Sequence, residues 1–158
     1  MRKQLFIALA GWMLFAQAAE FPDCKLISPA GEEHRLHQLQ TGKVVYLDFW
    51  ASWCPTCARS FKFLNALAED LGKRGLLVLA VNLDEEPEAA RSFLEQYPVR
   101  FTVLYDPHGD CARAFAVAGM PATYVIDRQG KVRYRQVGFR SEEANALKAR
   151  VEELVAEP

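Results

Sequence analysis

Two cysteines separated by two residues are the most reactive feature of this sequence. They are Cys54 and Cys57, in the segment 53–57 (WCPTC). The preceding residues 43–50 (KVVYLDFW) are β-branched and aromatic, which predicts a strand buried on both faces. After Cys57, apolar residues recur at helical spacing and the pattern stops at Gly72. The pair therefore lies where a buried strand gives way to a helix.

This position indicates what the two thiols can do. Unpaired backbone N–H groups and the positive dipole end of the helix stabilise a thiolate at Cys54. Cys57 lies one helical turn further along, within reach of the Cys54 sulfur. Cys54 can then attack a substrate disulfide, and Cys57 can resolve the mixed disulfide that results.

Two alternatives use the same cysteines without redox chemistry. A zinc site needs a second pair of ligands, and Cys24 and Cys111 are lone residues far apart, so no metal ligand is predicted. An inert structural disulfide between Cys54 and Cys57 is disfavoured, because so short a loop at a helix start is a redox geometry.

A single carboxylate, Asp48, interrupts the predicted strand 43–50. Burying a carboxylate among apolar residues is costly unless it is paired or protonated. The alternative is an Asp at the end of the strand that reaches water.

The rest of the chain alternates strands with helices. This order predicts an α/β layered sheet in one domain over residues 19–158. We expect strands at 21–27, 33–36, 43–50, 76–83, 101–105, 122–126 and 131–137. We expect helices from Cys57 to Gly72, from Pro87 to Pro98, over 110–116 and after a cap at Ser141. We interpret the acidic run 84–86 as the cap region of the second of these helices.

Composition agrees with a globular chain and excludes several classes of protein. Of 158 residues, 51% are hydrophobic and 25% are charged, with a net charge of −1. Disorder requires lower hydrophobicity and a higher net charge. No basic field exists to attract nucleic acid, so no nucleic-acid partner is expected. Four cysteines are too few for a miniprotein built on disulfides.

The N-terminus has the three parts of a secretory signal peptide. Arg2 and Lys3 are basic, residues 5–16 are apolar, and Ala16 and Ala18 fit a cleavage site. We therefore expect residues 1–18 to be a signal peptide and the protein to be periplasmic or otherwise exported. The alternative is an uncleaved membrane tether, although the apolar run is short of the roughly 20 residues that span a bilayer.

Three segments together resemble a known family. Residues 48–57 (DFWASWCPTC) resemble the active-site segment of the thioredoxin superfamily, and residues 119–121 (GMP) resemble its cis-proline loop. An inserted helix and strand over 86–105 resembles the TlpA/ResA branch of exported thiol-disulfide oxidoreductases. The resemblance implies a thioredoxin fold: a central mixed sheet flanked by helices, with that insertion and an N-terminal extension of short strands.

The resemblance also implies roles for individual residues. Cys54 is the nucleophile, Cys57 the resolving thiol, and Asp48 a buried proton acceptor beneath Cys57. Pro121 is cis, and the Met120 backbone pairs with the substrate chain. Substrate-binding residues are thus Trp53, Pro55, Met120 and Pro121, while Trp50 is either a wall of the site or a core residue.

The chain departs from the branch at three positions. Ser60 and Lys62 stand where the branch often has Glu and Pro, and Ala122 follows the cis-proline where cytochrome c maturation members carry Glu. The last departure makes a dedicated role in haem attachment less favoured.

The two remaining cysteines, Cys24 and Cys111, lie at positions where the family usually has apolar residues. We therefore expect two buried free thiols, and a disulfide between them is the alternative.

The predicted function is an exported thiol-disulfide oxidoreductase that reduces protein disulfides without a cofactor. Pro55 and Thr56 bring no charge to stabilise the Cys54 thiolate, whereas strong oxidants stabilise their reduced form. Expected partners are exported proteins with disulfides and a membrane thiol reductase as electron donor, and a monomer is expected. The alternatives are an oxidase or isomerase with the same site, and a non-enzymatic module that binds apo-cytochromes or metal.

Overall fold

The computed structural model describes residues 21–158, so the predicted signal peptide lies outside the described residues. A seven-stranded sheet, in the order β2-β1-β5-β4-β3-β6-β7, forms the centre of the fold. Its strands are β1 (Lys25–Ile27), β2 (Glu33–Arg35), β3 (Val44–Trp50), β4 (Leu76–Asn82), β5 (Thr102–Tyr105), β6 (Ala122–Ile126) and β7 (Val132–Val137).

The sheet is mixed, as predicted. β3 is parallel to β4, and β4 is parallel to β5, while β6 and β7 continue the sheet antiparallel on the other side of β3. The short strands β1 and β2 pair with each other and extend the β5 edge. Every residue of β3 is buried, because this central strand has neighbours on both edges and helices on both faces.

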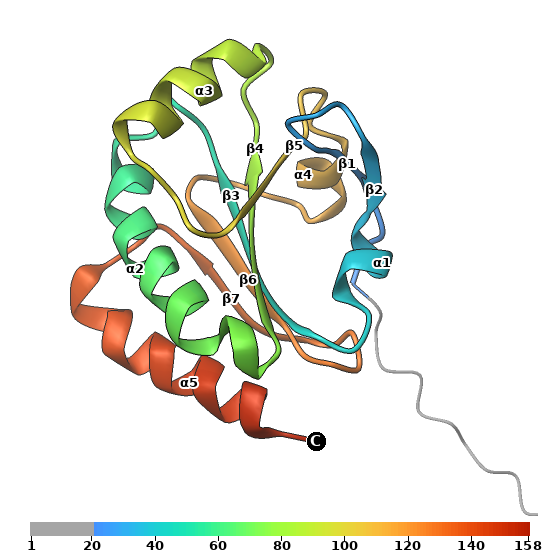
Figure 1. The fold of residues 1–158 in the computed structure, drawn as a ribbon, viewed down its shortest axis with the longest axis vertical. Helices are drawn as coiled ribbons and strands as arrows, with labels where there is room; N and C mark the ends of the chain where they lie inside the picture. The colour runs from blue at the N-terminus through green and yellow to red at the C-terminus, as the bar shows by residue number, and fades with distance from the viewer. Residues whose placement is uncertain (1–20) are drawn as a thin grey trace, which may run out of the picture.

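Helices cover the two faces of the sheet (Figure 1). On one face lie the long helices α2, α3 and α5, and on the other lie the short helices α1 and α4. The helices are α1 (Leu36–Gln40), α2 (Pro55–Leu71), α3 (Pro87–Gln96), α4 (Asp110–Ala114) and α5 (Ala144–Ala156), with 3-10 turns η1 (Gly72–Arg74) and η2 (Ser141–Glu143).

The alternation of side chains along the strands divides the core into two layers. On β3, Tyr46 and Trp50 enter the layer under α2, while Val45, Leu47 and Phe49 enter the opposite layer. Asp48 lies between Tyr46 and Trp50 in the alternation along β3, so its side chain points to the same face of the sheet as theirs. That layer also contains Cys54 and Cys57.

The predicted insertion 86–105 corresponds to α3 and β5. α3 begins with Pro87 in its first turn, as predicted, because a proline there loses no helical hydrogen bond. The last helix begins later than predicted. Ser141 makes no capping hydrogen bond and opens the η2 turn, after which α5 begins at Ala144. Within the part of the chain that the structure describes, no helix has the length and apolarity to cross a membrane.

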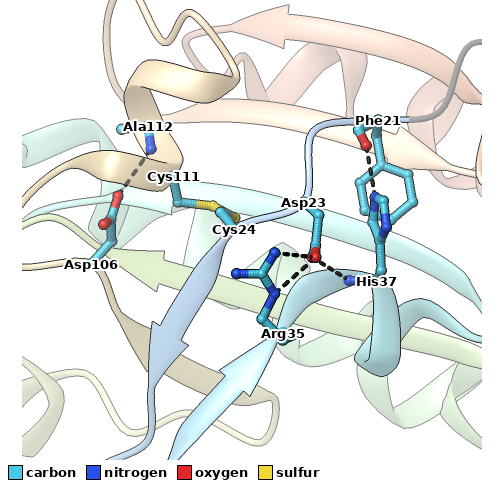
Figure 2. Close-up of a disulfide and its surroundings, with 8 residues drawn as sticks. All are labelled: Phe21, Asp23, Cys24, Arg35, His37, Asp106, Cys111 and Ala112. Atoms are coloured by element: carbon cyan, nitrogen blue, oxygen red, sulfur yellow. Dashed lines mark hydrogen bonds and ion pairs between the residues drawn. A yellow bond between two sulfur atoms is a disulfide. The ribbon is translucent and has the colours of Figure 1, made fainter.

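The expectation of free thiols at Cys24 and Cys111 is wrong, because the two form a disulfide (Figure 2). Their Cα atoms lie 5.2 Å apart, within the usual range for a disulfide. Cys24 immediately precedes β1, and Cys111 is in α4. The sheet order places β1 beside β5, and the chain after β5 leads directly into α4, so the two sulfurs meet in the layer away from α2.

Candidate active site

The turn from β3 into α2 holds the two reactive cysteines. Cys54 is the residue that caps α2, and Pro55 begins the helix. The backbone N–H of Cys57 donates to the Cys54 carbonyl over 3.1 Å, so Cys57 lies one turn along. The structure joins them in a disulfide with a Cα–Cα distance of 5.4 Å. The predicted position of the pair, where a buried strand meets a helix, is confirmed.

Exposure differs strongly within the motif. Cys57 is fully buried, and Cys54 is only 4% exposed in this disulfide form. The sulfur of Cys54 is turned toward Cys57 by the bond between them. Trp53, by contrast, is 68% exposed, and Pro55 is also exposed.

Thr56 contributes a polar contact that sequence analysis missed. Its hydroxyl oxygen lies 3.6 Å from the Cys54 sulfur. A hydroxyl can donate to sulfur, and such a donor stabilises a thiolate more than a neutral thiol. The signal was present in the sequence, because a residue between the two cysteines is necessarily close to them.

Asp84 holds the loop that precedes Cys54. Its carboxylate accepts hydrogen bonds from the Ser52 backbone N–H and the Ser52 hydroxyl, each over 2.9 Å, and from the Asn82 side-chain amide over 2.7 Å. The interpretation of the acidic run 84–86 as the cap region of α3 is confirmed for Glu86, the N-cap residue, but is wrong for Asp84. α3 is capped at Glu86 without a side-chain hydrogen bond, and Asp84 is buried against the β3–α2 turn instead.

The segment 119–121 leads into β6, whose first residue pairs with Phe49 near the end of β3. The Met120–Pro121 peptide bond is cis, as the resemblance implies. The Pro121 carbonyl accepts a hydrogen bond of 2.7 Å from the Gly138 N–H, which fixes the loop to the end of β7. Met120 is partly buried and packs against the same core layer that contains Cys54 and Cys57.

Asp48 is buried in the centre of β3, only 1% exposed, so the alternative in which it reaches water is wrong. Thr123 donates a hydrogen bond of 2.9 Å to its Oδ1 atom. The Oδ2 atom has no hydrogen-bond partner among the described residues. Burial raises the pKa of Asp48 from 3.8 to about 7, against a smaller lowering by the Thr123 hydrogen bond. A carboxyl group of this pKa can exchange a proton near neutral pH.

Comparison with known proteins decides the family. The Redoxin family model matches residues 16–150, which is most of the chain. The chain belongs to the Redoxin family. This redoxin is 32% identical over 139 residues to the thiol-disulfide oxidoreductase ResA of Geobacillus thermodenitrificans, an alignment that covers 82% of this chain and 79% of the relative.

Solved structures agree with this assignment. A thiol:disulfide interchange protein of the DsbE type from Chlorobium tepidum has 41% sequence identity and a TM-score of 0.83, covering 88% of this chain and 97% of that chain. The exposed lipoprotein thioredoxin of Streptococcus pneumoniae has 29% identity and a TM-score of 0.70, covering 84% and 100% of the two chains. The redoxin therefore has the thioredoxin fold and is a thiol-disulfide oxidoreductase of the ResA/DsbE type.

Two residues of the redoxin near the cysteines have structural roles. Trp50 is fully buried, and its ring contacts those of Phe61 and Phe93, so it is a core residue rather than an exposed wall of the site. Ser60, where the branch often has Glu, is buried and donates to the Cys57 carbonyl over 2.9 Å. Its hydroxyl is thus used within its own helix.

Sequence analysis also missed Thr123. Its hydrogen bond to Asp48 depends on the pairing of β6 with β3, which links residues that are distant in the sequence.

Proposed function

We propose that this redoxin is exported and reduces disulfides in other exported proteins, with Cys54 as nucleophile and Cys57 as resolving thiol. The observation that carries the proposal is the Cys54–Cys57 disulfide at the start of α2, in the same core layer as the buried carboxyl group of Asp48. The two half-reactions need a thiolate at Cys54 and a proton acceptor for Cys57. The start of α2 supports the first requirement, and the buried carboxyl group of Asp48 supports the second.

In the first half-reaction, the Cys54 thiolate of the reduced protein attacks one sulfur of the substrate disulfide. A bond forms between Cys54 and that sulfur, the substrate S–S bond breaks, and the other substrate sulfur leaves as a thiolate that takes a proton from water. The start of α2 favours the Cys54 thiolate, because unpaired N–H groups point toward it. The neighbouring Thr56 hydroxyl adds one more donor.

In the second half-reaction, Cys57 attacks the Cys54 sulfur. Its proton passes to Asp48, directly or through water, and the second substrate sulfur leaves as a thiolate. The products are the Cys54–Cys57 disulfide and a substrate dithiol, so two electrons pass from the redoxin to the substrate. Asp48 then loses its proton, which its pKa near 7 allows at neutral pH.

Residues around the cysteines support a polypeptide as the substrate. Trp53 is exposed beside the pair, and the cis peptide bond of Met120 and Pro121 immediately precedes β6, which pairs with the end of β3. Val137, also exposed, lies at the end of β7 against Gly119. Exposed apolar groups around a reactive disulfide suit the side chains that flank a cysteine in an extended chain. We assign Trp53, Pro55, Met120 and Pro121 to substrate binding.

The absence of a charged residue between the two cysteines supports reduction rather than oxidation as the direction of the reaction. The residues between the cysteines are Pro55 and Thr56, which carry no charge. A strong oxidant stabilises its reduced form, and no charged group in the motif does so here. A reductase that works outside the cytosol needs electrons, which a membrane thiol reductase supplies in this proposal.

Export rests on residues 2–18, whose basic, apolar and small-residue parts fit a signal peptide. The pneumococcal relative described as an exposed lipoprotein thioredoxin supports the same location. A periplasmic or otherwise exported monomer, with a tether if residues 1–18 are retained, is the form that we propose.

The test is turnover with insulin as the disulfide substrate and dithiothreitol as the electron source. The wild-type protein should accelerate insulin reduction, and Cys54→Ser should abolish the acceleration, whereas Cys57→Ser should accumulate a mixed disulfide with the substrate. The reduction potential should lie near the thioredoxin value of about −270 mV rather than the DsbA value of about −120 mV. Turnover by Cys54→Ser, or none by wild type, contradicts the proposal, and a potential near −120 mV reverses the proposed direction.

A further inference from the structure

A buried hydroxyl, that of Thr123, lies directly beside the carboxyl group of Asp48. Thr123 is in β6, two residues after Pro121, and the antiparallel register pairs it with Asp48 across the strands. Directly opposed residues on one face of an antiparallel pair have neighbouring side chains. Although the two residues are 75 positions apart in the sequence, the register of β3 and β6 brings them together. Thr123 Oγ1 donates a hydrogen bond of 2.9 Å to Asp48 Oδ1.

The two carboxylate oxygens of Asp48 are left in different states by this contact. Oδ1 is held by Thr123, whereas Oδ2 is buried and has no partner among the described residues. A buried oxygen without a partner is unfavourable, and a catalytic role is one reason for a fold to retain such an atom. Oδ1 is therefore occupied by the hydrogen bond from Thr123, and Oδ2 is the oxygen that is free to accept a proton.

The Tyr46 hydroxyl is a second polar neighbour of the Thr123 hydroxyl. The Tyr46 hydroxyl lies 3.4 Å from Thr123 Oγ1 on its other side. Burial raises the pKa of Tyr46 far above its usual range, and the negative charge of Asp48 raises it further, so the phenol keeps its proton. A threonine hydroxyl has one proton, and with Tyr46 as a donor to it, that proton goes to Asp48.

We propose that Thr123 is a positioning residue for the resolving step: its hydroxyl holds Oδ1 of Asp48, so that Oδ2 is kept in place to accept the proton of Cys57. This inference rests on the proposed function, because it assigns a task to Thr123 only through Asp48. Thr123 itself touches no reacting atom.

The proposal has a consequence for pH dependence. A hydrogen bond donated to a carboxylate favours its ionised form, and the Thr123 hydrogen bond lowers the pKa of Asp48 that burial has raised to about 7. The other titratable groups of this layer are Tyr46 on β3, Tyr105 on β5, Tyr134 on β7 and, in the reduced protein, the thiols of Cys54 and Cys57. Burial keeps the Tyr46 phenol neutral at working pH, and the β4 residue that pairs with Asp48, Ala80, is apolar.

The experiment separates the two half-reactions in one stopped-flow trace. Reduced protein is mixed with Ellman's reagent, whose first coloured thiolate reports attack by Cys54 and whose second reports resolution by Cys57. In Thr123→Val, the pH midpoint of the second phase should rise by about one unit, since a hydrogen bond to a charged group has about that effect on a pKa. At pH 7 the second phase should slow about fivefold, while the first phase should stay within about twofold of wild type.

Two further variants distinguish positioning from packing. Thr123→Ser keeps the hydroxyl and should restore the wild-type midpoint. In an Asp48→Asn background, Thr123→Val should leave the pH profile unchanged, because the group that it acts on is gone. If Thr123→Val does not fold, Thr123→Ala removes the same hydroxyl with less bulk and replaces it.

The outcomes can be told apart from failure of the proposed function. An unshifted midpoint in Thr123→Val, or an equal shift with and without Asp48, overturns the role of Thr123. Loss of the second phase from wild type, or its persistence in Cys57→Ser, overturns the proposed function instead.

Discussion

The proposed chemistry of this protein uses a group that destabilises the fold, the buried carboxyl group of Asp48. A carboxylate inside an apolar layer is destabilising, and the structure offsets this with only one hydrogen bond, from Thr123. The consequence is a pKa of about 7, raised by burial. At the scale of single residues, reactivity and stability are therefore opposed at position 48.

This opposition predicts how stability changes with pH. Because the pKa of Asp48 is raised on folding, from 3.8 to about 7, its contribution to stability is present at low pH and is lost as the pH rises through this interval. The loss approaches about 4 kcal/mol above pH 8. Asp48→Asn should remove this pH dependence, so that urea unfolding at pH 8 shows a more stable variant and at pH 4 shows little difference. A variant that is less stable than wild type at pH 8 would contradict this view of Asp48.

A second prediction concerns Thr56, whose hydroxyl lies 3.6 Å from the Cys54 sulfur. Thr56→Val removes a donor that favours the Cys54 thiolate, and hence the reduced form of the protein. The reduction potential should become more negative by about 20 mV, which is about 1 kcal/mol. Thr56→Ser is the matched control and should keep the wild-type potential. Redox equilibration with glutathione measures both variants, and a shift to a less negative potential in Thr56→Val would refute the assignment.

At the scale of elements, the site is a junction of three strand ends. The carboxyl ends of β3 and β4 lie side by side, and the cis-proline loop enters β6 next to them. Asp84, just after β4, binds Ser52, just after β3, and so ties the loop of the cysteines to the neighbouring strand. The loop is held in position by an element that contributes no reacting group.

We predict that this tie determines the position of Cys54. In Asp84→Asn, an amide N–H₂ replaces an oxygen that accepts from Ser52, so a donor faces a donor. We expect a loss of about 1–3 kcal/mol in the free energy of unfolding and a slower attack of Cys54 on Ellman's reagent. Glu85→Gln changes the charge of the exposed neighbour and should alter neither quantity. Equal urea midpoints for Asp84→Asn and Glu85→Gln would show that the hydrogen bonds between Asp84 and Ser52 do not stabilise the protein.

At the scale of the whole molecule, the Cys24–Cys111 disulfide joins the N-terminal strands to the segment that leads into the cis-proline loop. Both ends of the crosslink are held by further hydrogen bonds (Figure 2). Asp23, beside Cys24, accepts from the His37 backbone over 3.0 Å, and Asp106 accepts from the Ala112 backbone over 2.9 Å. The crosslink therefore connects segments that are themselves fixed.

The two disulfides should differ in what they contribute. The Cys24–Cys111 bond spans a separation of 87 residues, and the Cys54–Cys57 bond spans 3. Because a crosslink that closes a longer loop removes more entropy from the unfolded chain, Cys24→Ala with Cys111→Ala should lower the free energy of unfolding by about 2–5 kcal/mol. The matched double variant at positions 54 and 57 should lose clearly less. Equal losses in urea unfolding of the two oxidised proteins would contradict this assignment.

Much of the fold follows from local patterns in the sequence. β3 and β4 are almost wholly apolar, apart from Asp48 and Asn82, as strands buried on both faces require. The start of α2 follows from the placement of Pro55, and the start of α3 from that of Pro87. Where local signals were weak, as at η2, the predicted helix began too early.

The sequence by itself determined the CxxC pair, its place at the start of a helix and the carboxylate in the strand before it, because these depend on neighbours along the chain. Only the tertiary structure decided three contacts between distant residues: Thr123 with Asp48, 75 residues apart, Cys24 with Cys111, 87 apart, and Asp84 with Ser52, 32 apart. Each contact depends on which strands lie side by side and in what register. Periodicity shows which face of a strand is buried, but the partner of that face is selected by the packing of the whole sheet.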